Sequence, residues 1–140
     1  MKFLPQYTSH LTSNKSSLLA RIFGVFTINS SHYNQVHVML MENTAQLQQP
    51  ERLTYIFDLK GSLVDRKTKG VTKVSTTLKD VNFLLCCADR AKRGGKFINL
   101  FEAQRKQLFR IIEKDVIFLK TLGLMDYSLL IVIESKGERQ

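Results

Sequence analysis

The stretch "LTYIFDLKGSLVDR", Leu53 to Arg66, passes from an apolar run to a charged one. Its first half, Leu53 to Leu59, is rich in Thr, Tyr, Ile and Phe, the residue types that favour β-strands. A lysine, a glycine, a serine and an arginine come next. We therefore predict a strand whose end carries charge. That end is either an ordinary solvated strand end or a site built to hold a phosphate.

The sequence on both sides predicts a mixture of helices and strands. Two apolar runs around a short polar turn predict an antiparallel hairpin. We expect an α+β fold in which helices accompany an antiparallel sheet. The expected elements are a helix within Leu4–Leu19, the hairpin strands Leu18–Ile28 and Tyr33–Met41 around the turn Asn29–His32, helices at Leu78–Arg90 and Asn99–Gly123, and an apolar strand after Leu124.

The stretch Asn99–Gly123 gives the clearest helix prediction. Asn99 and Glu102 have the spacing of an N-terminal capping box, and Gly123 suits the C-terminal cap. Apolar side chains recur near helical spacing and predict a face that packs in the core. These residues are Leu100, Ala103, Leu108, Ile111, Ile112, Val116, Leu119 and Leu122.

Charge gives the first indication of a partner. The chain has 140 residues, with 21 Lys and Arg against 12 Asp and Glu, for a net charge of +9. Such a balance attracts nucleic acid, anionic lipid or phosphorylated ligands, and charge alone does not choose among them. The aromatic residues do not form a stacking signature, so we expect no nucleic acid partner.

We expect neither a membrane-spanning protein nor a metal-binding one. No run of about 18 apolar residues occurs, so we predict no transmembrane segment. The N-terminus has no apolar signal-peptide region. The two cysteines, Cys86 and Cys87, are adjacent and do not have the spacing of a zinc site, so we predict no metal ligand in this chain.

Two motifs carry more specific information. One is "DLKGSLVDR", Asp58 to Arg66, and the other is "LMDYSLL", Leu124 to Leu130. At these residues the chain resembles the phosphatidylinositol phosphate kinases, in particular those that are phosphatidylinositol 4-phosphate 5-kinase-like. That family has a DLKGSxxxR motif followed by an MDYSLL motif. The intervening "LKDVNFL" and the upstream "VMLMEN" also look like family segments, so the resemblance covers nearly the whole chain.

The resemblance implies a lipid kinase with a partial protein-kinase-like fold. Such enzymes transfer the γ-phosphate of ATP, with Mg²⁺, to a hydroxyl of a phosphatidylinositol monophosphate headgroup. Asp126 stands at the catalytic-loop position, where an aspartate accepts or orients the substrate hydroxyl proton. From the residue alone, a loop aspartate that caps a turn is the alternative.

The resemblance also implies binding residues. Lys60 and Arg66 are expected to bind the phosphates of the headgroup, since a lysine offers a point charge and an arginine a planar fork. A solvated strand end is the alternative. The segment Met41, Glu42 and Asn43 falls where the family's hinge meets adenine, and an ordinary strand end is again the alternative.

Further lysines and arginines suit an anionic membrane surface, or else form a solvated face. They are Lys67, Lys69, Lys73, Arg90, Lys92, Arg93 and Lys96. We therefore expect a cytoplasmic protein, peripheral at membranes, with phosphoinositide as its partner. The oligomeric state is not predicted.

The family's nucleotide clamp precedes the matched region, and its metal-binding aspartate and activation loop follow it. We expect residues 1–140 to be a partial catalytic domain without those segments. The chain is then part of a longer kinase, a truncated relative, or one member of an assembly. Its function is lipid phosphorylation or, alternatively, non-catalytic binding of phosphoinositide at a membrane.

Overall fold

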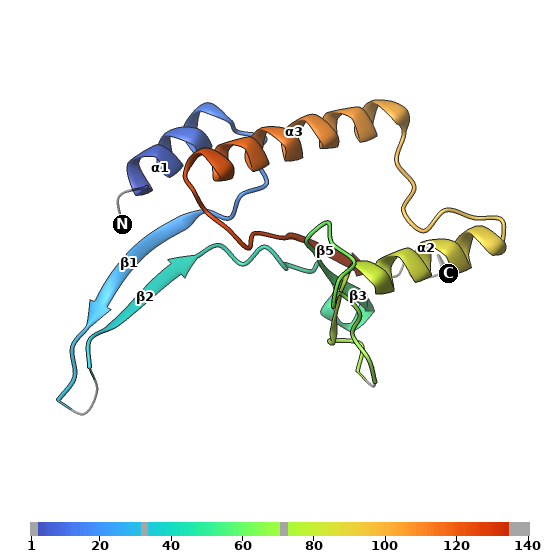
Figure 1. Cartoon of the computed structure of the whole chain (residues 1–140), viewed down its shortest axis with the longest axis horizontal. Coiled ribbons are helices and arrows are strands. Elements are labelled where there is room, and N and C mark those ends of the chain that lie inside the picture. Colours follow the sequence, from blue (N-terminus) through green and yellow to red (C-terminus); the bar gives the residue numbers. More distant parts are fainter. Residues whose placement is uncertain (1–2, 32–33, 71–72, 135–140) are drawn as a thin grey trace. The chain divides into compact units, whose positions relative to one another are not determined.

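A computed structural model of the chain describes residues 3–31, 34–70 and 73–134. Helices and strands both occur, so the predicted α+β class is confirmed (Figure 1). The elements in chain order are α1 (Leu4–Ser13), β1 (Ile22–Ile28), β2 (Val36–Met41), the 3₁₀ turn η1 (Pro50–Arg52), β3 (Leu53–Leu59), β4 (Thr77–Leu78), α2 (Asp80–Lys92), α3 (Glu102–Thr121) and β5 (Leu129–Glu134).

The described residues form two compact units, each of which is built from two stretches of chain. The first unit takes residues from Met1–Thr44 and Arg105–Leu124, and the second takes residues from Ala45–Gln104 and Met125–Gln140. Each unit is described by itself.

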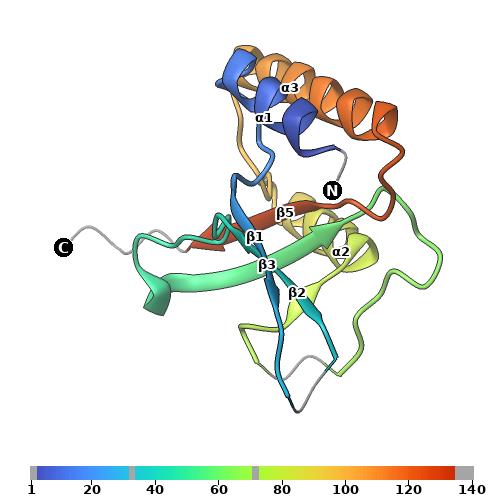
Figure 2. The ribbon, with the colours of Figure 1, turned by 90° about the vertical axis from the view of Figure 1, so that its left-hand side faces the viewer.

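The first unit contains the predicted hairpin and two packed helices. β1 pairs antiparallel with β2, with Ile28 opposite Val36, as the two apolar runs predicted. His32 of the predicted turn and Tyr33 of the predicted second strand lie outside the described residues. Figure 2 shows α1 lying alongside α3, where the ring of Tyr7 is 6.1 Å from that of Phe118.

A buried aspartate joins the two helices of this unit. Asp115 on α3 is only 5% exposed. Its Oδ1 lies 2.8 Å from His10 Nε2 and accepts a hydrogen bond of 2.8 Å from the Ser17 hydroxyl. Its Oδ2 accepts the Leu18 backbone N–H at 2.8 Å. The carboxylate therefore fixes α1 and the chain that follows it against α3, because a buried charge must be satisfied by polar partners.

The predicted termini of α3 are half right. Gly123 has φ +66° and closes the helix, with its N–H bonded to the Lys120 carbonyl and the Leu124 N–H bonded to the Leu119 carbonyl. The predicted capping box at Asn99 is wrong, because the helix begins at Glu102. The reach-back contact is instead made by Gln104, whose side chain accepts the Phe101 N–H at 3.0 Å.

The predicted apolar stripe of α3 is buried only in part. Leu119 is buried, and Leu108, Ile111, Ile112 and Leu122 are half-buried. Leu100, Ala103 and Val116 are exposed. The apolar periodicity therefore predicted the helix correctly, but other residues cover only part of its predicted apolar face.

The second unit is organised around β3. β3 pairs antiparallel with β5 on one side and parallel with the short β4 on the other, in the order β4-β3-β5. The predicted antiparallel pairing is therefore confirmed, with a short parallel pair added. α2 begins at Asp80, two residues after the predicted start at Leu78, which belongs to β4.

An aromatic cluster holds α2 against β3. Phe57 on β3 is completely buried. Its ring centroid lies 5.2 Å from that of Phe83 on α2 and 5.9 Å from that of Phe97, both edge to face. Tyr55 stacks on Phe57 at 5.6 Å. Such pairs stabilise beyond the area that they bury. The carboxyl end of β3 and the amino end of α2 are thereby held within one packed unit.

Candidate functional site

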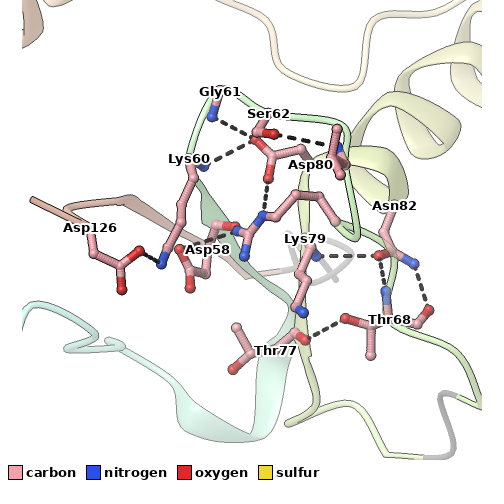
Figure 3. A network of polar contacts seen from close by, with 12 residues as sticks. Asp58, Lys60, Gly61, Ser62, Thr68, Thr77, Lys79, Asp80, Asn82 and Asp126 are labelled. Carbon is pink, nitrogen blue, oxygen red and sulfur yellow. Dashed lines mark hydrogen bonds and ion pairs between the residues drawn. The ribbon is translucent and has the colours of Figure 1, made fainter.

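The site lies where β3 ends, and strand pairing explains how its two motifs meet. Asp58 pairs with Leu130 and Leu59 with Leu129, so the end of β3 is beside the start of β5. Residues just after β3 therefore reach those just before β5. The ammonium group of Lys60 forms an ion pair with Asp126 Oδ1 (Figure 3). The antiparallel register thus brings together the two motifs that carried the resemblance.

Asp126 has an unusual backbone and an accessible carboxylate. Its φ is +62°, in the left-handed region that only a few per cent of non-glycine residues adopt. Its side chain is 82% exposed, whereas that of Lys60 is 26% exposed. The hydrogen bond from Lys60, and then the charge of Lys60, lower the pKa of Asp126 below its usual value. Asp126 is therefore ionised at neutral pH and can accept a hydrogen bond from a hydroxyl group.

A second aspartate organises the backbone after β3. Asp80, the first residue of α2, is 7% exposed. Its Oδ1 accepts the backbone N–H groups of Lys60 at 3.0 Å and Gly61 at 2.8 Å, as Figure 3 shows. Burial alone would raise the pKa of Asp80, but hydrogen bonds from Arg66, Gly61 and Lys60 lower it below its usual value. The carboxylate is therefore a charged anchor inside the unit.

Arg66 belongs to the same network. Its Nε donates to Asp80 Oδ2 at 2.8 Å, and its Nη2 donates to the Asp58 carbonyl. The Asp58 carboxylate lies 3.6 Å from Nη2. The Arg66 side chain is 12% exposed, about half the exposed fraction of Lys60. Two nitrogens of the guanidinium therefore bond to other residues of this unit. Of the two predicted headgroup residues, Lys60 is the more accessible.

The basic loop after Arg66 is fastened to α2 by an amide side chain. Asn82 Oδ1 accepts the Thr68 N–H at 2.8 Å, and Asn82 Nδ2 donates to the Thr68 carbonyl at 3.1 Å.

All seven basic residues that were predicted to face a membrane are exposed. Arg93 also forms an ion pair with Asp89 at 3.0 Å. The charges of this unit are accessible to an anionic partner.

The predicted nucleotide segment lies in the first unit, at the end of β2. The Glu42 N–H donates to the Arg21 carbonyl at 2.7 Å, and the Glu42 carboxylate accepts the Arg21 N–H at 3.1 Å. The backbone donor of Glu42 is therefore used within the hairpin. A base that met this segment would use other groups of Met41, Glu42 and Asn43.

Sequence reasoning missed the central member of the network. Asp80 falls in "LKDVNFL", which was read as part of a helix starting at Leu78. An acidic residue in a first helical turn signals a helix N-terminus and is stabilised there. That signal would have placed the start of α2 correctly. It would not have shown that the same carboxylate binds the chain after β3, which is a tertiary contact.

Comparison with known proteins identifies the family. The family model described as Phosphatidylinositol-4-phosphate 5-Kinase matches residues 1–140. The chain belongs to this family. The predicted resemblance to phosphatidylinositol phosphate kinases is thereby confirmed.

Several curated relatives match along nearly the whole chain. A protein of Dictyostelium discoideum named "Probable phosphatidylinositol phosphate kinase" is 33% identical over 132 residues, which are 93% of this chain and 17% of that protein. Phosphatidylinositol 4-phosphate 5-kinase-like protein 1 of Homo sapiens is 33% identical over 138 residues, covering 96% of this chain and 32% of that protein. The chain spans no more than about a third of the length of these relatives.

The described residues contain neither a membrane-spanning helix nor a cluster of metal-binding side chains. No helix among residues 3–31, 34–70 and 73–134 is both long and apolar enough to cross a membrane. Within the same ranges, no three His, Cys, Asp or Glu side chains gather as a metal site would require. The prediction that this chain supplies no metal ligand stays a prediction.

Proposed function

We propose that this chain is part of a phosphatidylinositol phosphate kinase that transfers the γ-phosphate of ATP to a hydroxyl of a phosphatidylinositol monophosphate headgroup. The ion pair between Lys60 and Asp126 is the observation that carries the proposal. It sets a lysine ammonium group and an ionised carboxylate side by side at the end of β3. Membership of the Phosphatidylinositol-4-phosphate 5-Kinase family supports lipid phosphorylation as the chemistry of this pair.

Lys60 can serve the headgroup and Asp126 at the same time. An ammonium group has three N–H donors, so one can remain on Asp126 while others bind an oxygen of a headgroup phosphate. A headgroup held in this way presents its ring hydroxyls close to the Asp126 carboxylate. Asp126 then orients the attacking hydroxyl and accepts its proton as the new O–P bond forms and the bond to ADP breaks.

Arg66 contributes to the same site in the proposal. Its Nε and Nη2 are bound inside the unit, which fixes the plane of the guanidinium. Among the described residues, no hydrogen-bond partner is found for Nη1. We therefore assign Nη1 to a phosphate oxygen. A fixed guanidinium loses little entropy when it binds, so the contact is stronger than one from a mobile side chain.

The remaining partners in the proposed reaction are the membrane surface, the nucleotide and Mg²⁺. The seven exposed basic residues would add about 1 kcal/mol each near an anionic surface, which supports a cytoplasmic enzyme peripheral at membranes. We assign Met41, Glu42 and Asn43 to the adenine of ATP, with the Glu42 N–H excluded because it bonds Arg21. Bound Mg²⁺ would neutralise charge on the transferred phosphate, and we assign it no ligand in this chain.

Phosphate transfer tests the proposal directly. A complete kinase that contains this chain would be incubated with γ-labelled ATP, Mg²⁺ and vesicles that contain phosphatidylinositol monophosphates. The expected product is a labelled bisphosphorylated lipid. Vesicle binding without label would favour the alternative, a non-catalytic module in which Lys60 and Arg66 bind headgroups. If the protein shows neither label transfer nor vesicle binding, both proposed functions are contradicted. Stronger binding to DNA than to vesicles would point to a nucleic acid partner.

A further inference from the structure

We propose that Asp80 is a positioning residue of the headgroup site: its carboxylate fixes the backbone that carries Lys60 and the guanidinium of Arg66. The inference rests on the proposed function, because it concerns the site assigned there to the headgroup. It adds a residue that belongs to neither of the two motifs that carried the resemblance. Asp80 would act only through Lys60 and Arg66, without touching the lipid.

The geometry of the carboxylate supports this role. Three donors from the chain after β3 converge on its two oxygens. Oδ1 accepts the backbone N–H groups of Lys60 and Gly61 (Figure 3). Oδ2 accepts Arg66 Nε. Gly61 has φ +73°, so the chain turns sharply here, in a conformation that glycine adopts readily. This turn points two successive N–H groups at one oxygen, which holds the backbone of Lys60 after β3 has ended.

The support is rigid because Asp80 is itself immobilised. It is the first residue of α2, and the aromatic cluster of Phe57, Phe83 and Phe97 packs that helix against β3. The Val81 N–H also donates to the Arg66 carbonyl at 3.0 Å. Arg66 is therefore bound to the start of α2 through its side chain and its backbone. A binding side chain gains precision when its supporting contacts are fixed in this way.

The change in affinity on removal of Asp80 distinguishes a positioning role from a simple effect of its charge. A carboxylate beside a phosphate site repels the phosphate, so removal of Asp80 should strengthen anion binding if only charge mattered. If Asp80 positions Lys60 and Arg66, its removal should weaken headgroup binding despite the added positive charge. The two explanations predict opposite changes for the same substitution.

The experiment compares Asp80→Asn and Asp80→Ala with the control Asp115→Asn. Asp115 is also a buried aspartate with three polar partners, and it lies in the other unit. Binding is measured to phosphatidylcholine vesicles that contain phosphatidylinositol monophosphate, and to vesicles of equal charge that contain phosphatidylserine. The ratio of the two affinities reports selective headgroup binding, and melting curves show which variants are folded.

We expect Asp80→Ala to lower this ratio by at least about tenfold, since the loss of one charge-assisted contact is enough for that change. Asp80→Asn keeps an oxygen for the two backbone N–H groups but loses the ion pair with Arg66, so its ratio should be intermediate. It also provides the test if Asp80→Ala does not fold. Asp115→Asn should keep the wild-type ratio, even where its melting temperature falls.

Failure of the inference is distinguishable from failure of the proposed function. If wild-type chain prefers the phosphoinositide vesicles and folded Asp80 variants keep that preference, Asp80 has no positioning role and the headgroup site stands. If folded Asp80 variants bind both vesicles more strongly, charge alone explains its effect and the inference is overturned. If wild-type chain itself has no preference, the headgroup assignment fails and the inference falls with it.

Discussion

Asp126→Asn is expected to lower the rate of phosphate transfer by about 10²–10⁴-fold, the usual contribution of a general acid or base. Asparagine has nearly the same shape and also tolerates the left-handed backbone, so the φ of +62° can be kept. It cannot accept the proton of the attacking hydroxyl as a carboxylate does. Binding to phosphoinositide vesicles should stay near the wild-type level, because Lys60 and Arg66 remain.

Asp65→Asn is the matched control for this substitution. Asp65 is the other non-glycine residue with positive φ among those that the structure describes, at +54°, and it too is exposed. Asp65→Asn removes the same charge as Asp126→Asn and places the same amide side chain on a similar backbone. Transfer is measured in a complete kinase that contains this chain, as label incorporated into lipid by the two variants and by the wild type. Normal turnover in Asp126→Asn would show that this carboxylate is not catalytic.

The double variant Lys60→Ala with Arg66→Ala is expected to weaken binding to phosphoinositide vesicles by about 100-fold or more. Each charge-assisted hydrogen bond lost costs about 1.5–3 kcal/mol, and every 1.4 kcal/mol is about a factor of ten in affinity. The two losses will not be strictly additive, because both residues bond to Asp80. Sedimentation with vesicles measures the change.

The single variants separate binding from folding. Arg66→Ala leaves the buried Asp80 carboxylate without its guanidinium partner, which is destabilising by about 3–5 kcal/mol in typical buried pairs. Lys60→Ala leaves its own backbone N–H on Asp80, so it should weaken binding with little loss of fold. Lys15→Ala with Lys120→Ala removes the same charge from exposed positions of the first unit. Equal weakening by both double variants would mean that net charge, and not the site, binds the lipid.

The elements that the sequence predicted well are those with local signals. The apolar run Tyr33–Met41 and the β-rich run Leu53–Leu59 predicted strands. Gly123 marked the end of α3, because glycine readily adopts the left-handed conformation that closes a helix in this way. Asn99 misled because a plausible cap in sequence does not fix where the helix starts. Gln104 supplied the contact instead.

The candidate site was predictable in its parts but not in its arrangement. Lys60, Arg66 and Asp126 were singled out by their motifs, yet no local pattern shows that Lys60 reaches Asp126 across the sheet register. The burial of Arg66 between Asp58 and Asp80 also depends on tertiary packing. Asp115 was missed for the same reason, since a charged residue on a helix is usually exposed.

The most direct measurement is an NMR titration of the Lys60 side-chain ammonium signal with a soluble phosphatidylinositol monophosphate headgroup. The central claim is that the end of β3 binds that headgroup beside Asp126. We predict a saturable shift at Lys60, which Asp80→Asn weakens, while Lys120 on α3 does not shift. An unchanged Lys60 signal, or equal shifts at all exposed lysines, would contradict the claim and leave the basic charge of the chain as its only attraction for the lipid.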